Sequence, residues 1–473
     1  MARFTRVPPP LTAAIAAYAA GFGALSVLRD RAFSTGRFDL GNMVQAVWST
    51  AHGDPLRVTN LSGEQVSRLG SHTDVVLALF APLWWIWPSA SMLLVVQAAA
   101  IALGALPVFW LARKHLGSER AGIGFALAYL LYPATTWLTL NEFHPVALAT
   151  PALLYAFWYL DEDRLVPFGV FAALAAGSKE EVALVIAGYG VWYALARGRR
   201  AAGAAVATIS LVSSAIAIAV VIPHFNGGHS AFEGRYSEVG GSPGGILHTA
   251  FHDPALLVRV ALDHAGAHYL LDLVVPLAGL CLLSPIALAA LPELAVNLLS
   301  STSTQTSIHF HYTAAEIPPL VIAAVFGAAR VGPRWRVPVA TVVLLAALAG
   351  NYRLGAIPFW RELPGGQTLQ TRAASVTEHD RITARALRLV PRSAIVSATN
   401  SLGAHLSARR RILSFPYVQD ATWIAADETQ PGYADRVAPL PAIAQLAWLR
   451  RNPAWRLVFE QDGVLVFQRV LPP

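Results

Sequence analysis

Long apolar stretches, separated by short polar gaps, dominate the first 350 residues of this chain. A helix needs about 20 mainly apolar residues to cross the hydrocarbon core of a bilayer, and several runs approach or reach that length. The pattern predicts about eleven transmembrane helices, near residues 11–28, 91–112, 121–138, 146–160, 165–178, 182–196, 201–222, 266–284, 285–300, 312–329 and 337–350.

From about residue 351 the pattern changes to that of a soluble domain. Ser375-Val-Thr-Glu378 has the form of a capping box and predicts the start of a helix. The turn Gln461-Asp462-Gly463 between two apolar runs predicts a hairpin. The further predicted elements are strands at Ala394–Ala398, Arg411–Ser414, Thr422–Ala426, Arg456–Glu460 and Val464–Gln468, and a helix near Leu440–Arg451.

The expected fold is therefore mainly α, with two parts. A polytopic membrane helical bundle occupies residues 1–350, with a first outer loop at about 29–90. Residues 351–473 form a linker and a small C-terminal α/β domain outside the cytoplasm.

Composition agrees with a membrane protein, because 55% of the residues are hydrophobic and 13% are charged, against about 25% charged in soluble domains. The formal net charge is +7, but the basic residues lie in small groups between apolar runs. That distribution is typical of membrane topology and argues against nucleic-acid binding. The single cysteine, Cys281, excludes a disulfide scaffold and a thiolate metal cluster.

Basic loops predict the orientation of the bundle. Lys and Arg cluster at the N-terminus and in alternate short loops, near residues 113–120, 164, 197–200 and 330–336. The positive-inside rule places these segments in the cytoplasm, and an odd number of spans then places the C-terminal domain outside a bacterial plasma membrane. Val75–Pro88, with three tryptophans, is expected on the outer surface, and Asn226–Gly245 is expected to be a flexible outer loop.

The same assignment collects the unusual polar residues on the outer side. An ionised side chain at the bilayer centre costs about 2.5–3.5 kcal/mol or more, so such groups usually line a polar cavity. The candidates are Arg37, Asp39, Gln45, His72, Asp74, Asn141, Glu142, His144, Lys179, Glu180, Glu181, His309, His311 and Tyr312.

Lys179-Glu180-Glu181 stands between two short apolar runs, which measure about 21–23 Å as helices. The hydrocarbon layer is about 30 Å thick, so these charges should lie recessed below the outer surface. Lys179 is one of only two lysines, which suggests a specific need for an ammonium group. The alternative is a simple turn with self-paired charges.

Asp39 has two interpretations. It can be a general base that takes a proton from an acceptor hydroxyl, or a first-turn charge favoured by the helix dipole. Glu142, His144, His309 and His311 supply groups that could bind a divalent metal or sugar hydroxyls, or they could be packing groups. His72 and Asp74 could likewise only cap the following helix, and Arg409–Arg411 are expected to form a solvated face.

The order of five motifs resembles a family of polytopic membrane proteins, the domain-of-unknown-function family 2079. The motifs are FDLGNMVQAVW at Phe38–Trp48, LGSHTD at Leu69–Asp74, NEFHP at Asn141–Pro145, SKEEV at Ser178–Val182 and HFHYTA at His309–Ala314. That family is in turn similar to the GT-C superfamily of membrane glycosyltransferases, which move a sugar from a polyprenyl phosphate carrier to an acceptor outside the cytoplasm.

The resemblance implies roles for the polar residues. Asp39, which matches the acidic residue of the first outer loop in that fold, would be the catalytic base, with inversion at the sugar carbon. Lys179 and Arg37 would bind the phosphate, and Glu142, His144, His309 and His311 would orient the sugar or hold Mg²⁺ or Mn²⁺. Other substrate contacts would come from Gln45, His72, Asp74, Asn141, Glu180, Glu181 and Tyr312.

The donor implied is a polyprenyl phosphate sugar, and the acceptor is a cell-envelope glycan, lipid or protein chosen with help from the C-terminal domain. Two other functions stay open. A transporter or flippase also has many spans and recessed charges, and a structural or sensory protein would use the outer domain to bind a partner. Against transport, the polar residues gather on one side of the bundle and the chain shows no inverted repeat.

Overall fold

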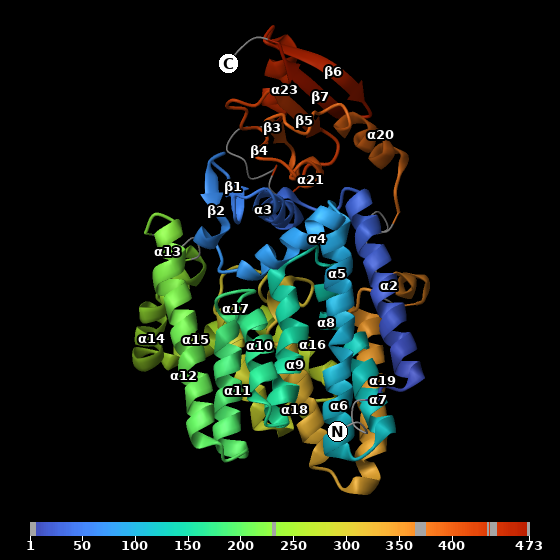
Figure 1. Cartoon of the computed structure of the whole chain (residues 1–473), viewed down its shortest axis with the longest axis vertical. Helices are drawn as coiled ribbons and strands as arrows, with labels where there is room; N and C mark the ends of the chain where they lie inside the picture. The colour runs from blue at the N-terminus through green and yellow to red at the C-terminus, as the bar shows by residue number, and fades with distance from the viewer. Residues whose placement is uncertain (1–5, 229–232, 365–374, 433–434, 436–441, 471–473) are drawn as a thin grey trace.

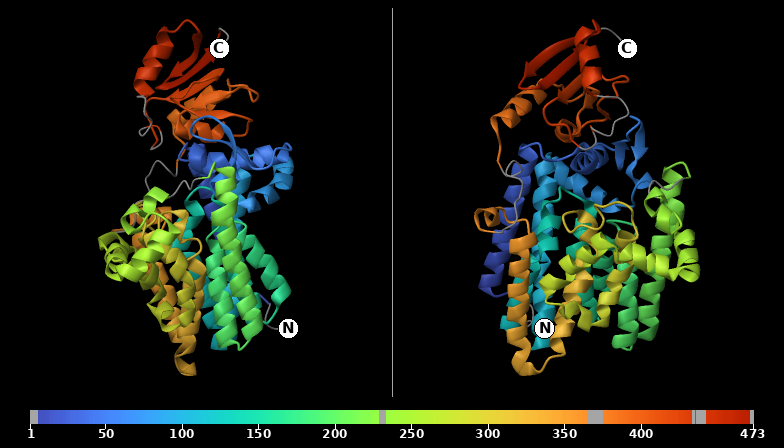
Figure 2. Two further views of the ribbon diagram at one scale, coloured as in Figure 1. Left: turned by 90° about the vertical axis from the view of Figure 1, so that its left-hand side faces the viewer. Right: turned by 180° about the vertical axis from the view of Figure 1, so that it is seen from behind.

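The computed structural model describes residues 6–228, 233–364, 375–432, 435 and 442–470. Figure 1 shows a bundle of helices below, a sheet domain above, and the first outer loop between them. The two further views in Figure 2 keep this order, so the sheet domain stands on one end of the bundle.

Four helical segments among the described residues are long and apolar enough to cross a membrane. They are α2 (Pro9–Arg31), α5 with α6 (Ala90–Leu103 and Ala105–Leu116), α12 through α13 (Arg200–Ile216 to Ile222–Phe225), and the segment Pro333–Leu354 that contains α19 (Arg336–Leu354). A fifth, bent by 48°, joins α7 (Glu119–Leu131) to α8 (Pro133–Leu140). Pro133 explains the bend, because its nitrogen cannot donate a helical hydrogen bond.

The predicted count of about eleven spans is not confirmed. Several predicted spans are shorter helices, namely α9 (Ala149–Asp161), α10 (Leu165–Ala176), α11 (Val182–Ala196) and α18 (Ile317–Ala329). The predicted span 266–284 is broken after α16 (His264–Val274), where Ala278 and Gly279 adopt positive φ. The next one consists of η9 (Pro285–Ala290) and α17 (Leu291–Leu298).

Contacts join the basic loops at one end of the bundle. Lys114 Nζ lies 2.7 Å from a carboxylate oxygen of Asp161, and Arg336 donates a hydrogen bond to the carbonyl of Leu116. Arg197 and Arg199 both pair with Asp163. The grouping of these loops, which the charge pattern predicted, is therefore present in the structure.

The first outer loop forms a small layer over the opposite end of the bundle. It contains a π-helical turn η1 (Arg37–Gly41), α3 (Asn42–Ala51), the antiparallel strands β1 (Arg57–Thr59) and β2 (Gln65–Ser67), and the short helices η2 (Arg68–Gly70), η3 (Val75–Phe80) and α4 (Ala81–Ile86). Helix α3 buries Met43, Val44 and Val47 in one apolar cluster with Phe80 and Phe143. This cluster fixes the loop against the helix ends.

Residues 226–245 differ from the predicted flexible loop. Of the described residues, η6 covers Glu233–Val239 and α14 covers Pro243–His252, followed by α15 (Pro254–Ala261). Ser242 starts α14 because its hydroxyl accepts a hydrogen bond from the backbone of Gly245. Residues 229–232 lie outside the described part.

The C-terminal domain has a mixed five-stranded sheet in the order β4-β3-β5-β7-β6. Strands β3 (Val396–Ala398), β4 (Ile412–Ser414) and β5 (Trp423–Asp427) are parallel, and β6 (Trp455–Gln461) and β7 (Val464–Arg469) form the predicted hairpin. Helices α20 (Glu378–Leu387), α21 (Asn400–His405) and α23 (Ala442–Arg451) complete it. The capping box is formed by Thr377 and Asp380, two residues beyond the predicted Ser375.

The C-terminal domain contacts the first outer loop closely. Two backbones meet where η1 lies against α21, and glycine permits the approach: a Cβ at Gly41 would lie 3.2 Å from the Cα of Ala404. The Arg37 backbone also donates a hydrogen bond to the side chain of Asn400. The sheet domain therefore helps to hold the turn that carries Asp39.

Candidate functional site

A polar cavity of about 170 Å³ lies between the first outer loop and the helix ends beneath it. Seven of the residues singled out from the sequence line it, which are Asp39, His72, Asp74, His144, Lys179, His311 and Tyr312. They come from segments up to 273 positions apart, as the numbers of Asp39 and Tyr312 show. The other lining residues are Phe38, Met43, Arg68, Pro145, Val146, Ser178 and Arg235.

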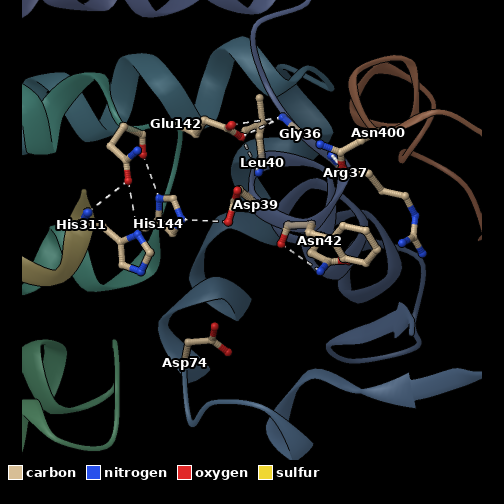
Figure 3. Close-up of polar contacts among 12 residues, drawn as sticks. Gly36, Arg37, Asp39, Leu40, Asn42, Asp74, Glu142, His144, His311 and Asn400 are labelled. Atoms are coloured by element: carbon tan, nitrogen blue, oxygen red, sulfur yellow. Dashed lines mark hydrogen bonds and ion pairs between the residues drawn. The ribbon is translucent and has the colours of Figure 1, made fainter. Parts of the chain in front are cut away.

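Asp39 projects from η1 into the cavity with about half of its side chain exposed. His144 Nε2 lies 3.3 Å from Asp39 Oδ1, and His144 Nδ1 lies 2.8 Å from the carbonyl oxygen of Asn141 (Figure 3). A carbonyl oxygen can only accept, so Nδ1 carries a proton.

The surroundings of Asp39 favour its ionised form. Burial raises the pKa of the Asp39 carboxyl, but the hydrogen bond and charge of His144, together with the charge of Arg68, lower the pKa below its usual range. A carboxylate that is ionised near neutral pH and reaches the cavity is able to accept a proton from a hydroxyl group.

Glu142 positions Asp39 instead of lining the cavity. Its Oε2 accepts hydrogen bonds from the backbone nitrogens of Gly36 and Leu40, at 3.1 and 2.9 Å, and its Oε1 accepts from Gly36 at 3.1 Å (Figure 3). Glu142 itself adopts φ of 49°, in the left-handed region that non-glycine residues rarely enter. The carboxylate therefore braces the η1 turn on either side of Asp39.

Two lining residues, Lys179 and His72, are each paired with a buried glutamate. Lys179 pairs with Glu181 and lies 5.6 Å from the centre of the Tyr312 ring. His72 Nδ1 lies 2.8 Å from Glu180 Oε1. Burial lowers the pKa of Lys179, but the surrounding carboxylates outweigh it and raise the pKa, so the amine stays protonated.

The cavity also contains two arginines that the sequence did not single out. Arg68 donates through Nε to Asp74 at 2.8 Å, and Arg235 comes from η6. Arg68 stands six positions before Asp74, but nothing in the local pattern shows that they pair. Arg235 lies in a segment that was interpreted as a flexible loop, so its place in the wall was not predictable from the sequence.

Arg37 and Gln45 lie away from the cavity, in contrast to their predicted substrate contacts. Arg37 is fully buried, and its guanidinium donates hydrogen bonds to the carbonyl oxygens of Thr59 and Ile412, at 2.7 and 2.8 Å, and to Ser414 Oγ at 2.7 Å. The Gln45 amide donates to the carbonyl oxygens of Arg409 and Arg410. Both side chains join the first outer loop to the C-terminal domain.

The four predicted metal ligands do not come together in one group among the described residues. Among the described residues no three His, Cys, Asp or Glu side chains come together in a way that could hold a metal ion. Glu142 is used by backbone nitrogens, and His309 packs edge-on against Trp137, with ring centres 4.7 Å apart. His144 and His311 do stack, with ring centres 3.7 Å apart, but a pair of stacked rings is not a ligand set.

The remaining predicted residues support the cavity wall. Asn141 Oδ1 accepts a hydrogen bond from the backbone of His311 at 3.0 Å. Glu180 Oε2 accepts another from the backbone of Thr73 at 3.1 Å. Glu180 and Glu181 are buried beside His72 and Lys179. These groups hold the lining residues and do not themselves line the cavity.

Fold and site together define a class: a multi-pass helical membrane protein with a charged cavity beneath a small sheet domain at one end of the bundle. A family model described as "Predicted membrane protein (DUF2079)" matches residues 29–466. The chain therefore belongs to this family. No curated protein matches the chain.

The fold is shared with ArnT of Cupriavidus metallidurans. The crystal structure of that protein bound to undecaprenyl phosphate aligns with a TM-score of 0.56 and 12% identity, covering 98% of each chain. Its apo structure aligns with a TM-score of 0.55 and 12% identity, covering 96% of this chain and 97% of the other. At this identity the likeness shows the fold over the whole chain.

Proposed function

We propose that this protein is a GT-C-type membrane glycosyltransferase that moves a sugar from a polyprenyl phosphate carrier to an acceptor on the side where the C-terminal domain lies. The observation that supports this most directly is the placement of Asp39, a lowered-pKa carboxylate that shares one cavity with Lys179, Arg68 and Arg235. The cavity thus combines a proton acceptor with cations suited to a phosphate.

The proposed reaction is an inverting displacement. Asp39 takes the proton of an acceptor hydroxyl while the hydroxyl oxygen forms a bond to the anomeric carbon of the sugar. The bond from that carbon to the phosphate oxygen breaks, and its electron pair leaves with the polyprenyl phosphate. His144, held by the carbonyl of Asn141, fixes the orientation of Asp39 throughout.

Cations on the cavity wall would stabilise the charge that grows on the leaving phosphate. Lys179 is protonated and nearly buried in the cavity wall, which supports its proposed role in binding the phosphate. Arg68 engages Asp74 through Nε alone among the described residues, so its terminal nitrogens remain to donate to phosphate oxygens. Arg235 completes the cationic side of the cavity.

An adjoining apolar pocket suits the lipid part of such a donor. It has a volume of about 330 Å³ and is lined by η3, α4, α5, α9 and α10. Val76 lines it two residues after Asp74, and its nitrogen donates to the carbonyl of Gly177, next to Ser178 of the polar cavity. A polyprenyl chain in this pocket would therefore place its phosphate beside the charged wall.

Asp39→Asn tests the assignment of the base. The substitution keeps the size of the side chain but removes its basicity, so we expect transfer to fall on the order of 10²- to 10⁴-fold. Purified protein would receive labelled polyprenyl phosphate sugars with an envelope extract as acceptor, and label transfer would be measured. Glu119→Gln, at an exposed carboxylate on the first residue of α7, is the matched control.

Two outcomes would reject the proposal. Equal transfer by Asp39→Asn would remove Asp39 as the base, and no transfer from any donor would reject the enzyme assignment in favour of a transporter or flippase. Treatment of the active preparation with EDTA tests whether transfer requires a divalent cation. Since the expected ligands do not converge, we expect activity to persist.

A further inference from the structure

A second cleft, larger than the cavity around Asp39, opens between the first outer loop and the C-terminal domain. Its volume is about 760 Å³. One wall comes from Trp48 of α3 and from residues Gly63–Gln65 between and within β1 and β2, and the other from Arg392–Ile395 and from Arg410 and Arg411. No role assigned above uses this cleft.

The two walls are fixed to one another by hydrogen bonds. Arg411 Nε donates to the carbonyl of Gly63 at 2.8 Å, and Gln419 Nε2 donates to the carbonyl of Ser62 at 2.6 Å. The amide of Gln45 and the guanidinium of Arg37 add further bonds between the same two units. The cleft is thus part of a braced interface and its lining residues hold fixed positions.

Arg392 and Arg410 line this cleft, and their guanidinium groups are available for a ligand. The side chains of Arg392 and Arg410 are exposed, and neither makes a hydrogen bond or ion pair with another described residue. Arg411 is already engaged by Asp420 and Gln419. The lining contains three arginines and one acidic residue, Glu64, so the cleft carries an excess of positive charge.

Trp48 gives the cleft an aromatic wall. Its ring is half-buried and stacks on His52, with ring centres 4.4 Å apart. An indole offers a broad apolar face and a polar edge, which suits the C–H face of a sugar ring. Guanidinium groups recognise carboxylates and phosphates through paired N–H donors.

We propose that this cleft binds an acidic saccharide, whose carboxylates or phosphates meet Arg392 and Arg410 while a sugar ring packs on Trp48. The identification of this saccharide as the acceptor glycan rests on the function proposed above. Helix α3 supports this identification as the acceptor, because it links the two sites. Asn42 at its start lies three residues beyond Asp39 of the polar cavity, and Trp48 of the cleft lies farther along the same helix. Asp39 and Trp48 are nine positions apart, which is about 10–15 Å of helical rise at 1.5 Å per residue, a distance that an extended glycan bridges.

Binding to the full-length protein in nanodiscs, measured by calorimetry without any donor, tests the proposal. The acidic probes are an oligogalacturonate and a phosphomannan oligosaccharide, and a malto-oligosaccharide of equal length is the neutral probe. We expect at least one acidic probe to bind, and the double variant Arg392→Ala/Arg410→Ala to weaken that binding about tenfold or more. Trp48→Ala should weaken it too, whereas Arg451→Ala, an exposed arginine outside the cleft, should not.

Several results would overturn the proposal. They are binding of neither acidic probe, equal binding of the neutral probe, and no effect of the double variant. Equal binding of polyglutamate would assign the cleft to an acidic peptide, and loss of the signal in nanodiscs that contain phosphatidylglycerol would assign it to lipid headgroups. Asp39→Asn should bind the acidic probe normally. If the wild-type protein binds the acidic probe but transfers no sugar from any donor, the proposed binding site is retained and the proposed function is rejected.

Discussion

At the scale of single residues, charge alone does not tell which polar group faces the cavity. Asp39 and Arg37 are two positions apart, yet Asp39 enters the cavity and Arg37 is buried against the C-terminal domain. The π-helical turn η1 separates them, because successive residues of a helical turn point in different directions. A prediction for either residue therefore depends on its backbone and not only on its type.

His144→Gln should change the pH dependence of transfer more than its maximum. The hydrogen bond and charge of His144 hold the pKa of Asp39 down, while burial acts in the opposite direction. Without His144 the pKa of Asp39 rises, so on acidification the variant should lose its activity at a higher pH than the wild type does. Below that pKa the rate should fall about tenfold per pH unit.

The measurement is the pH profile of kcat/KM for the wild type and the variant. His309→Gln is the matched control, because this imidazole packs on Trp137 outside the cavity. An unchanged acid limb in His144→Gln would show that His144 does not control the ionisation of Asp39.

Arg37→Met should destabilise the docking of the C-terminal domain. The change removes three hydrogen bonds of a buried guanidinium and leaves the carbonyl oxygens of Thr59 and Ile412 without that donor. An unsatisfied buried polar group costs about 1–3 kcal/mol, so we expect a loss of about 2–5 kcal/mol in total. Thermal unfolding and hydrogen exchange at Ile412–Ser414 would detect it.

Arg451→Met is the control for this substitution, since Arg451 is exposed at the end of α23. If Arg37→Met kept both its melting temperature and its exchange protection but lost donor binding, Arg37 would be a substrate contact as the sequence suggested.

At the scale of elements, short and broken helices shape the site. The spans that the sequence predicted at 165–178 and 182–196 are the short helices α10 and α11, and the loop between them carries Lys179 into the cavity wall. Helices η3 and α4 are also short, and they lie where the polar cavity adjoins the apolar pocket. Because these helices are short, the polar backbone groups at their ends lie close to the charged side chains of the cavity wall.

Ala100→Trp should block the proposed lipid pocket without unfolding the bundle. Ala100 lines the pocket from α5 and is only partly buried, so a large side chain would occupy the space of the polyprenyl chain. We expect KM for the donor to rise about tenfold or more, since each buried CH₂ of the chain contributes about 0.8 kcal/mol. Transfer assays at varied donor concentration would measure it.

Val170→Trp, an exposed position on α10 outside the pocket, is the matched control. Equal KM values in the two variants, with equal thermal stability, would show that the donor chain does not enter the pocket.

At the scale of the whole molecule, the basic loops lie at the end of the bundle away from the first outer loop (Figure 1). The charged cavity lies at the other end, because Asp39 and Arg68 of that loop line it. The C-terminal sheet stands on the same end as the cavity, and its contacts with the first outer loop involve the turn that carries Asp39. The end with the basic loops is expected in the cytoplasm.

Cysteine labelling in intact cells tests this orientation. In a Cys281→Ala background, Leu61→Cys lies exposed in the loop between β1 and β2, and Ala201→Cys lies exposed at the start of α12 near the basic loops. We expect a membrane-impermeant maleimide to label Leu61→Cys in intact cells and Ala201→Cys only after permeabilisation. The reverse pattern would place the cavity on the cytoplasmic side and remove the case for an outer acceptor.

The sequence by itself determined the mainly helical membrane module, the sheet domain with each of its strands, and half of the residues that line the cavity. These features follow from local periodicity, from runs of apolar residues, and from the cost of placing charges such as Lys179 in lipid. Local patterns also located the hairpin at Asp462, because turn chemistry needs only a few adjacent residues.

Only the tertiary structure decided how those residues are used. In the structure Arg68 pairs with Asp74, and Glu142 accepts hydrogen bonds from the backbone of η1. Arg235 lines the cavity, and Arg37 links the first outer loop to the C-terminal domain. The structure also showed helices too short or too broken to confirm the number of spans. The physical reason is that hydrogen bonds and ion pairs between distant segments depend on packing, which no local pattern records.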